Sequence, residues 1–297
     1  TEIYTLSLHD ALPILARRHA DELARLRATG ATATSARVRL LRALDQLDGL
    51  GRAFAAEGIR WALVKGPGLA LTAWPDPFAR PFSDLDVFVP PVRFGDAVVT
   101  LLGLGYRAEG VPDVSAVHWT FTRPDAFAVE LHHAFSREFP VSPALLERFC
   151  ADTVGVYAGA VAVPGGGPEV PVPAPAAHLA YVLLHAYNHG WQLGLSWALD
   201  VHFLLGRDPA LARAALDFFP RSWPVALSLR AAGLVIPELG ELVRALAPPT
   251  PRERLLLAAI GANLTYGGPG IAGSGLCRVL ASPAPLATLA CMFARHH

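Results

Sequence analysis

The residues with the clearest chemical potential are two aspartates, Asp84 and Asp86, in an apolar run that continues through Val89. On an extended strand, positions i and i+2 point to the same side, about 6.6 Å apart at a rise of roughly 3.3 Å per residue. Two bare carboxylates at that spacing repel each other and are costly to bury. A divalent cation relieves the repulsion, and Mg²⁺ takes carboxylate and phosphate oxygens together. The pair therefore predicts a metal site on a strand.

A third carboxylate is available on a later strand. Within residues 127–132, the apolar Val129 and Leu131 alternate with Glu130 and His132, which leaves the two polar side chains on one side. Neighbouring strands lie about 5 Å apart. Glu130 can therefore complete a clamp for two metal ions, and His132 can orient Glu130 or contact phosphate.

The only lysine of the chain stands in a turn. Of the 25 basic residues, 24 are arginine, and Lys65 is followed by Gly66 directly after the apolar run 59–64. A strand, a glycine turn and a helix in succession present backbone N–H groups to phosphates. A lysine retained among arginines indicates a need for a compact point charge. We expect Lys65 and Gly66 to contact phosphate, with Arg80 as a second phosphate ligand. The alternatives are a lysine left by chance and a solvated loop arginine.

Composition bounds the class of protein. The chain has 297 residues, of which 53% are hydrophobic and 17% charged, so it can build a sizeable core. The formal net charge is zero and no long basic run occurs, which excludes a broad nucleic-acid-binding surface. Three unclustered cysteines argue against a disulfide scaffold or a cysteine zinc site. We expect a protein of the cytoplasm, with no segment that spans a membrane.

The elements that must position these residues follow from hydrophobic periodicity and from Gly and Pro punctuation. Two helices are expected over 16–57, separated near Gly30. Strands are expected at 59–64, 84–89, 117–122 and 127–133, helices at 69–74 and 94–104, and a small hairpin within 154–175. Six helices follow, at 176–189, 195–206, 209–218, 223–235, 252–264 and 276–294.

This pattern predicts an α+β fold, in which a small mixed β-sheet carries the carboxylates between N-terminal helices and a C-terminal helical domain. We expect residues 1–15 to be a non-native segment, because the opening 14 residues resemble a translated sequencing adaptor and offer no fold. The N-terminal helices are expected at 16–57, the sheet core at 58–163 and the C-terminal helical domain at 174–297.

The combined motif resembles the DNA polymerase β-type nucleotidyltransferase superfamily, and more closely a bacterial family of uncharacterised nucleotidyltransferases. The resemblance covers about residues 35–205 and rests on these segments: Leu63-Val64-Lys65-Gly66, Trp74-Pro75-Asp76-Pro77, Arg80, Asp84-Leu85-Asp86-Val87-Phe88-Val89, Val129-Glu130-Leu131-His132, His185 and Trp197-Ala198-Leu199-Asp200. One departure is that Lys65-Gly66 stands where the superfamily usually has Gly-Ser or Gly-Gly.

The resemblance implies a Mg²⁺-dependent nucleotidyltransferase that moves an NMP from an NTP, with ATP expected, to an unidentified acceptor. The acceptor would be a small molecule, a protein or an RNA end. Asp84, Asp86 and Glu130 would hold two Mg²⁺ ions, and Glu130 would help to activate the acceptor hydroxyl. The nucleotide would contact the residues Lys65, Gly66, Arg80 and His132.

Two other readings stay open at this stage. The first is a catalytically degenerate nucleotide-binding or adaptor module, which the changed glycine turn favours and the three carboxylates oppose. The second is a histidine-centred metal hydrolase, because His185 and His189 lie at i, i+4 on one helical face, a spacing that suits zinc. Ala186 stands where the metalloprotease motif has glutamate. These histidines, with Trp197 and Asp200, could instead line an acceptor pocket or satisfy one another in a packed interface.

Overall fold

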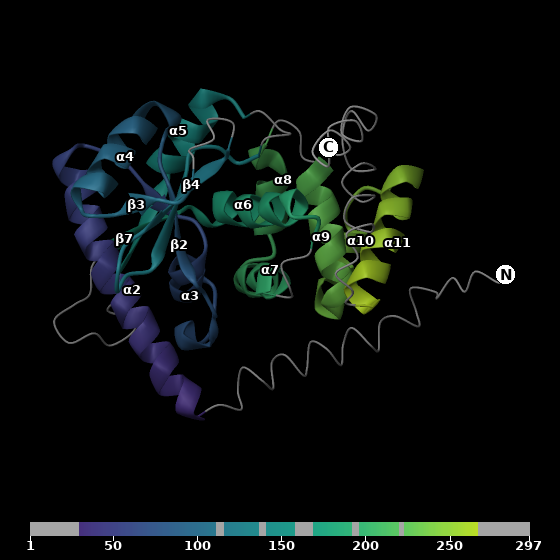
Figure 1. Ribbon diagram of the computed structural model, residues 1–297. Coiled ribbons are helices and arrows are strands. Elements are labelled where there is room, and N and C mark those ends of the chain that lie inside the picture. Colours follow the sequence, from purple (N-terminus) through teal and green to yellow (C-terminus); the bar gives the residue numbers. More distant parts are fainter. Residues whose placement is uncertain are drawn as a thin grey trace, which may run out of the picture.

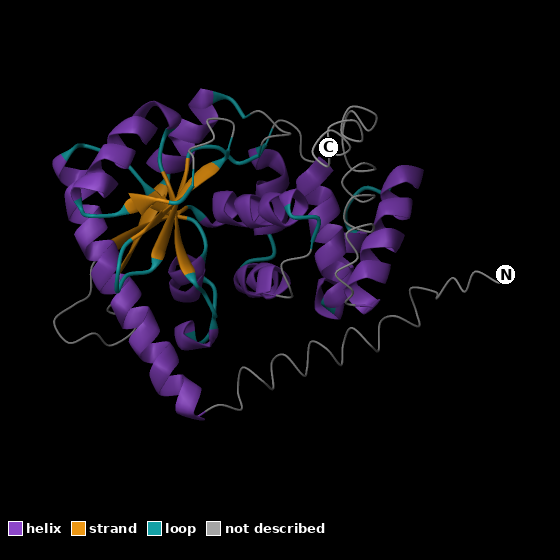
Figure 2. Ribbon diagram, viewed as in Figure 1, coloured by secondary structure: helices purple, strands orange, loops and turns teal. Residues whose placement is uncertain are grey.

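The computed structural model describes residues 30–110, 116–136, 141–157, 169–191, 196–219 and 223–266. In this part of the chain a five-stranded sheet lies among helices, and a group of further helices stands beside it (Figures 1 and 2). The predicted α+β class with a small mixed sheet is therefore confirmed. The helices predicted before residue 30 and at 276–294 lie outside the described residues.

The sheet combines one parallel strand pair with three antiparallel pairs. β2 and β5 run parallel, whereas β1 with β2, β4 with β5, and β3 with β4 are antiparallel. In spatial order the strands are β1 (Ala62–Leu63), β2 (Asp84–Phe88), β5 (Ala128–His132), β4 (His118–Thr122) and β3 (Arg107–Ala108). β1 is shorter than the predicted strand 59–64, and the two-residue β3 is too short to show an alternating pattern.

Helices on one face of the sheet complete its core. The long α2 (Gly30–Ala56) presents a stripe of buried leucines and Phe54 to the sheet, as its three- and four-residue spacing predicts. α4 (Phe94–Gly103) packs into the same core through Ala97 and Leu101. Short elements connect the strands: α3 (Gly66–Thr72), η1 (Pro77–Ala79) and η2 (Pro91–Arg93).

A helix that the sequence analysis did not expect lies between the sheet and the small hairpin. α5 (Pro143–Ala151) begins after Ser142, whose hydroxyl accepts a hydrogen bond from the Leu145 N–H at 3.3 Å. Serine before a proline at the first helical position is a helix-start signal that was available in the sequence. The expected hairpin is present as β6 (Thr153–Tyr157) paired antiparallel with β7 (Glu169–Pro173).

The remaining described helices form a second core, in which α6 is the most central element. α6 packs against α7, α8 and α9, and most of its residues are buried. These helices are α6 (Pro175–Asn188), α7 (Ser196–Arg207), α8 (Leu211–Phe218), α9 (Trp223–Val235), η4 (Pro237–Leu239), α10 (Gly240–Arg244) and α11 (Pro251–Tyr266). Over the described residues, none of the helices combines the length and apolarity needed to cross a membrane. The domain boundaries given above stay predictions.

The two faces of the central strands differ sharply. Leu85, Val87, Val129 and Leu131 point into the core that α2 and α4 cover. The alternate residues point to the opposite face, where Phe88 joins the core of the C-terminal helices. This face also carries acidic and histidine side chains, so the candidate site lies where the sheet meets α6.

Candidate active site

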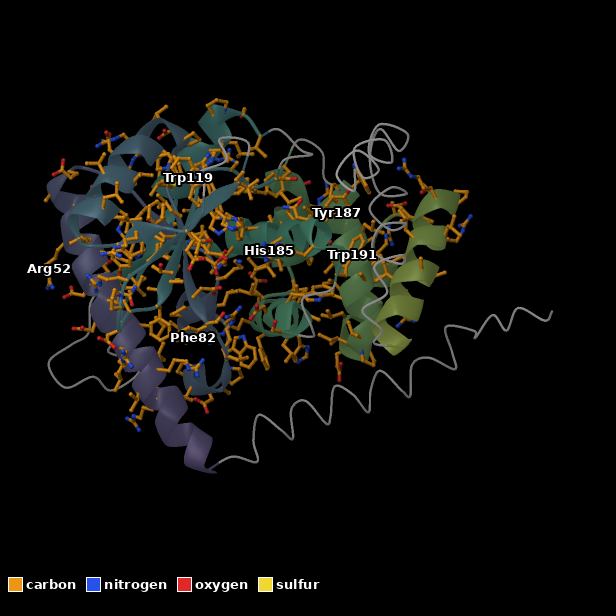
Figure 3. The ribbon with its side chains drawn as sticks, viewed as in Figure 1. Arg52, Phe82, Trp119, His185, Tyr187 and Trp191 are labelled. Atoms are coloured by element: carbon orange, nitrogen blue, oxygen red, sulfur yellow. The ribbon has the colours of Figure 1, made fainter. Side chains whose placement is uncertain are left out.

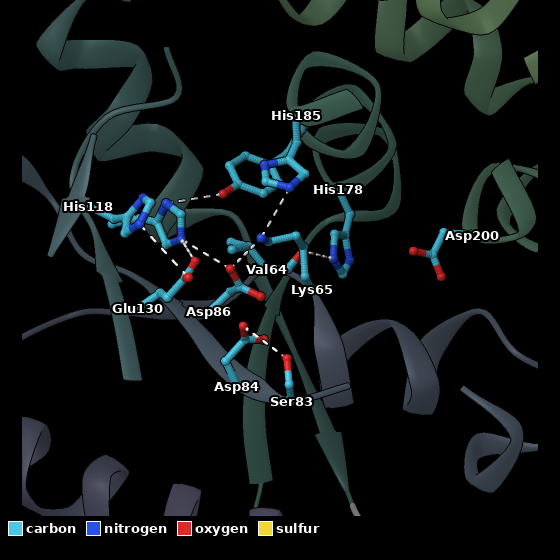
Figure 4. Close-up of polar contacts among 12 residues, drawn as sticks. Val64, Lys65, Ser83, Asp84, Asp86, His118, Glu130, His178, His185 and Asp200 are labelled. Atoms are coloured by element: carbon cyan, nitrogen blue, oxygen red, sulfur yellow. Dashed lines mark hydrogen bonds and ion pairs between the residues drawn. The ribbon is translucent and has the colours of Figure 1, made fainter. Parts of the chain in front are cut away.

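The register of β2 and β5 groups the predicted carboxylates. Asp86 pairs with Glu130 across the two parallel strands, and Asp84 precedes Asp86 by two positions on the same face. Figure 4 shows the three carboxylates pointing into one region between the sheet and α6. The structure thus brings Asp84, Asp86 and Glu130 together, on the face opposite the α2 core.

Asp86 is the buried centre of this group. It is 2% exposed, and its Oδ1 forms an ion pair with the Lys65 ammonium and a hydrogen bond with His132 Nε2, at 3.1 Å for the latter. Burial alone would raise the pKa of the Asp86 carboxyl. The charge of Lys65 and the bond from His132 outweigh burial and hold the pKa of Asp86 well below its ordinary value. Asp86 is therefore a carboxylate at neutral pH.

His132 joins the two strands chemically. Its Nε2 lies 3.1 Å from Asp86 Oδ1 and 3.4 Å from Glu130 Oε2, and its Nδ1 lies 3.4 Å from the Tyr181 hydroxyl of α6. Burial lowers the pKa of His132, but its hydrogen bonds to the two carboxylates outweigh that effect and raise the pKa overall. For Tyr181, burial and the charges of Asp86 and Glu130 raise the pKa well above its ordinary value. The carboxylates are thus linked through one imidazole, whose orientation α6 supports.

Lys65 lies at the turn between β1 and α3, and its ammonium points into the same region (Figure 4). Besides the Asp86 ion pair, Lys65 Nζ donates to His185 Nε2 at 3.3 Å. Burial and the charge of Lys65 keep the pKa of His185 well below its ordinary value, so His185 is a neutral acceptor. Gly66 takes φ +47°, and a Cβ there would lie 3.3 Å from the Asp84 carbonyl oxygen. Glycine lets this turn approach β2 closely.

Asp84 is the least compensated carboxylate of the three. The Ser83 hydroxyl donates to Asp84 Oδ2 at 3.3 Å. Burial, followed by repulsion from Asp86 and Glu130, raises the pKa of Asp84 despite the nearby Lys65 charge. The site therefore holds more negative charge than its own cations neutralise.

Arg80 is directed to another partner. Its Nε and one terminal nitrogen bind the two oxygens of Asp200 on α7, both at 2.8 Å, and the Trp74 indole N–H donates to Asp200 at 2.7 Å. Arg80 and Asp200 are both buried. A guanidinium held in this bidentate fork positions the chain between η1 and β2. Arg80 binds Asp200 and not the site carboxylates, although, after Asp200, the charges of Asp86 and Asp84 contribute to raising its pKa. Its expected contact with phosphate stays a prediction.

Three site residues were missed by the sequence reasoning. His118 of β4 lies beside His132 with ring centroids 4.7 Å apart, and its Nε2 is 3.9 Å from Glu130 Oε1. Burial and the charge of His132 lower the pKa of His118. Tyr181 and His178 come from α6; His178 Nε2 donates to the Val64 carbonyl at 2.7 Å. The spacing of 178, 181 and 185 on one helical face was a usable signal, whereas nothing local marked His118.

The pair proposed for zinc has a different setting. The rings of His185 and His189 lie 4.4 Å apart, but His185 Nε2 already accepts from Lys65. Among the described residues, the group whose ligand atoms lie within 4.8 Å of one another is His118, Glu130 and His132. The i, i+4 histidines are therefore not where the structure gathers metal-ligating atoms.

The site thus combines a small mixed sheet with two aspartates on one strand, a glutamate on its neighbour and a lysine–glycine turn beside them. The sequence model of one family, described as "Uncharacterised nucleotidyltransferase", matches residues 9–240. The chain belongs to this family, and the resemblance found in the sequence is confirmed. No curated protein matches the chain.

Proposed function

We propose that the protein transfers an NMP from an NTP, ATP in the first instance, to an acceptor in a Mg²⁺-dependent reaction. The observation that supports the proposal is the grouping of Asp84, Asp86 and Glu130 on one sheet face. Family membership supports the general class, nucleotidyl transfer. The proposed acceptor is a small molecule or a protein, and the proposed location of the reaction is the cytoplasm.

The donor set fits divalent cations. Three carboxylates share one face of the sheet, although the three together are not a group whose ligand atoms lie within 4.8 Å of one another in the described residues. Asp84 has no cation bonded to it among these residues. Hard cations such as Mg²⁺ take oxygen ligands of this kind. Asp84, Asp86 and Glu130 would hold two Mg²⁺ ions, and the bound ions would supply positive charge to neutralise the phosphates.

The chain's own residues then have distinct tasks. The Lys65 ammonium supplies a point charge for phosphate oxygens, and His185 orients it through the 3.3 Å contact. Gly66 brings the turn close to Asp84. Glu130 accepts the proton of the acceptor hydroxyl, and His132, bonded to both Asp86 and Glu130, fixes the direction of the two carboxylates.

One observation favours a second candidate function. Asp86 is almost fully buried and already neutralised by Lys65, which is the state expected of a degenerate module that binds nucleotide without turnover. In the enzyme, by contrast, Lys65 must exchange Asp86 for phosphate when nucleotide binds. The two candidates therefore differ in turnover and not in nucleotide binding.

The experiment is an incubation of the full chain with each α-labelled NTP and with candidate acceptors, with and without Mg²⁺. The proposal expects label on an acceptor and release of pyrophosphate, both dependent on Mg²⁺. Asp84→Asn should abolish transfer, while Asp96→Asn, an exposed aspartate of α4, should transfer normally. Nucleotide binding with no transfer at any acceptor would favour the degenerate module instead.

A further inference from the structure

A second set of metal-ligating atoms overlaps the carboxylate group and is richer in nitrogen. His118, Glu130 and His132 each offer one ligand atom, and these atoms lie within 4.8 Å of one another. Two of the residues share β5, and His118 pairs with His132 across the antiparallel β4–β5 ladder. All three side chains therefore lie on one face because of strand geometry.

From this arrangement we propose that His118, Glu130 and His132 form a site for a borderline divalent transition metal, with Zn²⁺ as the reference ion, distinct in chemistry from Mg²⁺. Two imidazoles and one carboxylate are donors that suit Zn²⁺ or Co²⁺, whereas Mg²⁺ prefers oxygen alone. This site shares Glu130 with the proposed Mg²⁺ ligands. A role of the site in catalysis therefore rests on the proposed function, whereas binding of the ion does not.

The separations come close to those around a common ion. Ligands at about 2.0–2.1 Å from a tetrahedral Zn²⁺ lie roughly 3.3 Å from one another. His132 Nε2 and Glu130 Oε2 are 3.4 Å apart, and His118 Nε2 and Glu130 Oε1 are 3.9 Å apart. These two contacts are to different oxygens of Glu130, and one ligand atom from each of the three residues lies within 4.8 Å of the others, so the side chains must move closer together to share an ion. An ion would replace the proton through which His132 now contacts the carboxylates.

The surroundings of the two histidines differ. His118 Nε2 faces Glu130, and its other nitrogen, Nδ1, is buried without a hydrogen-bond partner in the described part of the chain, so no such partner orients His118. His132 receives support at its other nitrogen from the Tyr181 hydroxyl at 3.4 Å. A second partner at the far nitrogen is the usual way in which a protein orients a metal-binding histidine.

The test uses the full chain after treatment with a chelator. Equilibrium dialysis measures its binding of Zn²⁺, and the visible absorption of Co²⁺ measures its binding of that ion. We expect one equivalent to bind in excess Mg²⁺. His118→Gln should weaken Zn²⁺ binding by about 100-fold or more, since even an indirect partner of a ligand contributes 10–100-fold. The control His202→Gln, on α7, should bind as the unchanged protein does.

Folding and the neighbouring aspartates are controlled separately. Zn²⁺ should raise the thermal unfolding midpoint of the unchanged protein and not that of His118→Gln. A cooperative melting transition of His118→Gln in the same experiment shows that this variant is folded. Asp84→Asn should lose Mg²⁺-dependent transfer and keep its Zn²⁺ affinity, so the two proposals can fail separately. Undiminished Zn²⁺ affinity in His118→Gln, or its loss in Asp84→Asn, would overturn the histidine site.

Discussion

Two buried aspartates of this protein have nearly equal exposure and opposite settings. Asp86 and Asp200 are each 2% exposed. Asp200 is bound by the fork of Arg80 and by the Trp74 indole, three donors in fixed directions. Asp86 is bound by the flexible Lys65 ammonium and by His132. Figure 3 shows how side chains from the sheet and from the C-terminal helices fill the region between these elements, with His185 near its centre.

The difference separates a rigid ion pair from one whose partners can be exchanged. The bidentate Arg80–Asp200 pair fixes both groups in one geometry and joins η1 to α7. A lysine and a histidine can each take another partner, because an ammonium rotates freely and an imidazole changes its proton count. We therefore infer that Asp200 holds the fold together and that Asp86 can exchange its partners during a reaction.

The largest expected effect is on transfer in Asp86→Asn. Loss of one ligand of the proposed metals should lower the transfer rate by at least about 10³-fold, or about 4 kcal/mol. A label-transfer assay measures this. The same change should also destabilise the fold by about 1–3 kcal/mol, because the half-buried Lys65 and the buried His132 lose the negative charge that they share.

Asp84→Asn should abolish transfer as Asp86→Asn does, but it should leave the stability of the fold unchanged or slightly higher. Burial and repulsion raise the pKa of Asp84, so its charge opposes folding. From the sequence alone both variants are expected to behave like Asp84→Asn, and the contacts of Asp86 reverse that expectation for one of them. Equal urea-unfolding curves for Asp84→Asn and Asp86→Asn would contradict the expected difference in how the two carboxylates affect stability.

Asp200→Ala should act on stability first. Leaving the buried Arg80 without its acceptor should cost about 3–5 kcal/mol, measured by urea unfolding. Asp217→Ala removes the exposed α8 partner of Arg213 and should cost no more than about 0.5 kcal/mol. Replacing the pair together, as Arg80→Met with Asp200→Leu, should recover most of the loss. A double variant as unstable as Asp200→Ala would show that the ion pair has a role beyond mutual neutralisation.

A pH-dependent effect of intermediate size is expected at His178, which lies between Lys65 and Asp200 in Figure 4. Burial lowers the pKa of His178 to about 4, despite its bond to the Val64 carbonyl. Unfolded histidine titrates near 6.5, so between pH 6.5 and 4 the unfolded chain binds the extra proton. Stability is then full above pH 6.5 and falls by about 3 kcal/mol as the pH drops to 4.

The comparison for this prediction is His178→Gln, which keeps a donor for Val64 and cannot titrate. Unfolding free energies of both proteins should be measured from pH 7 to pH 4. The unchanged protein should lose more stability than the variant over that interval. Parallel pH profiles would mean that His178 is hydrated or already charged in the folded protein.

Local patterns predicted the strands that carry Asp84, Asp86 and Glu130, because alternation on a half-buried strand is visible in a short window. They did not predict β3, which consists of two residues, or α5, whose start signal was overlooked. The partnership of Arg80 with Asp200 spans 120 residues, and no local pattern encodes such a distance. The resemblance to a nucleotidyltransferase family had grouped both residues in one motif without indicating that they bind each other.

The site shows the same limit. Its acidic members could be recognised because two carboxylates on one strand face are unusual without a cation. His118 could not, because its place beside His132 depends on the β4–β5 register. Lys65 could be recognised only because the other 24 basic residues are arginines. Its replacement is expected to have the smallest effect among the variants considered.

Lys65→Ala should weaken binding of ATP in the presence of Mg²⁺ by about 1.5–3 kcal/mol, the contribution of a charge-assisted hydrogen bond. Lys65→Arg should weaken it less, although the charge is kept. The reason lies in the comparison of the two aspartates. A planar fork would bind Asp86 as Arg80 binds Asp200, in two directions at once, and would release it to phosphate less readily than a rotating ammonium does. Equilibrium binding of ATP measures both variants, with Arg60→Ala, an exposed partner of Glu147, as the control. Equal affinities for Lys65→Arg and the unchanged protein would show that the site needs only a positive charge at residue 65.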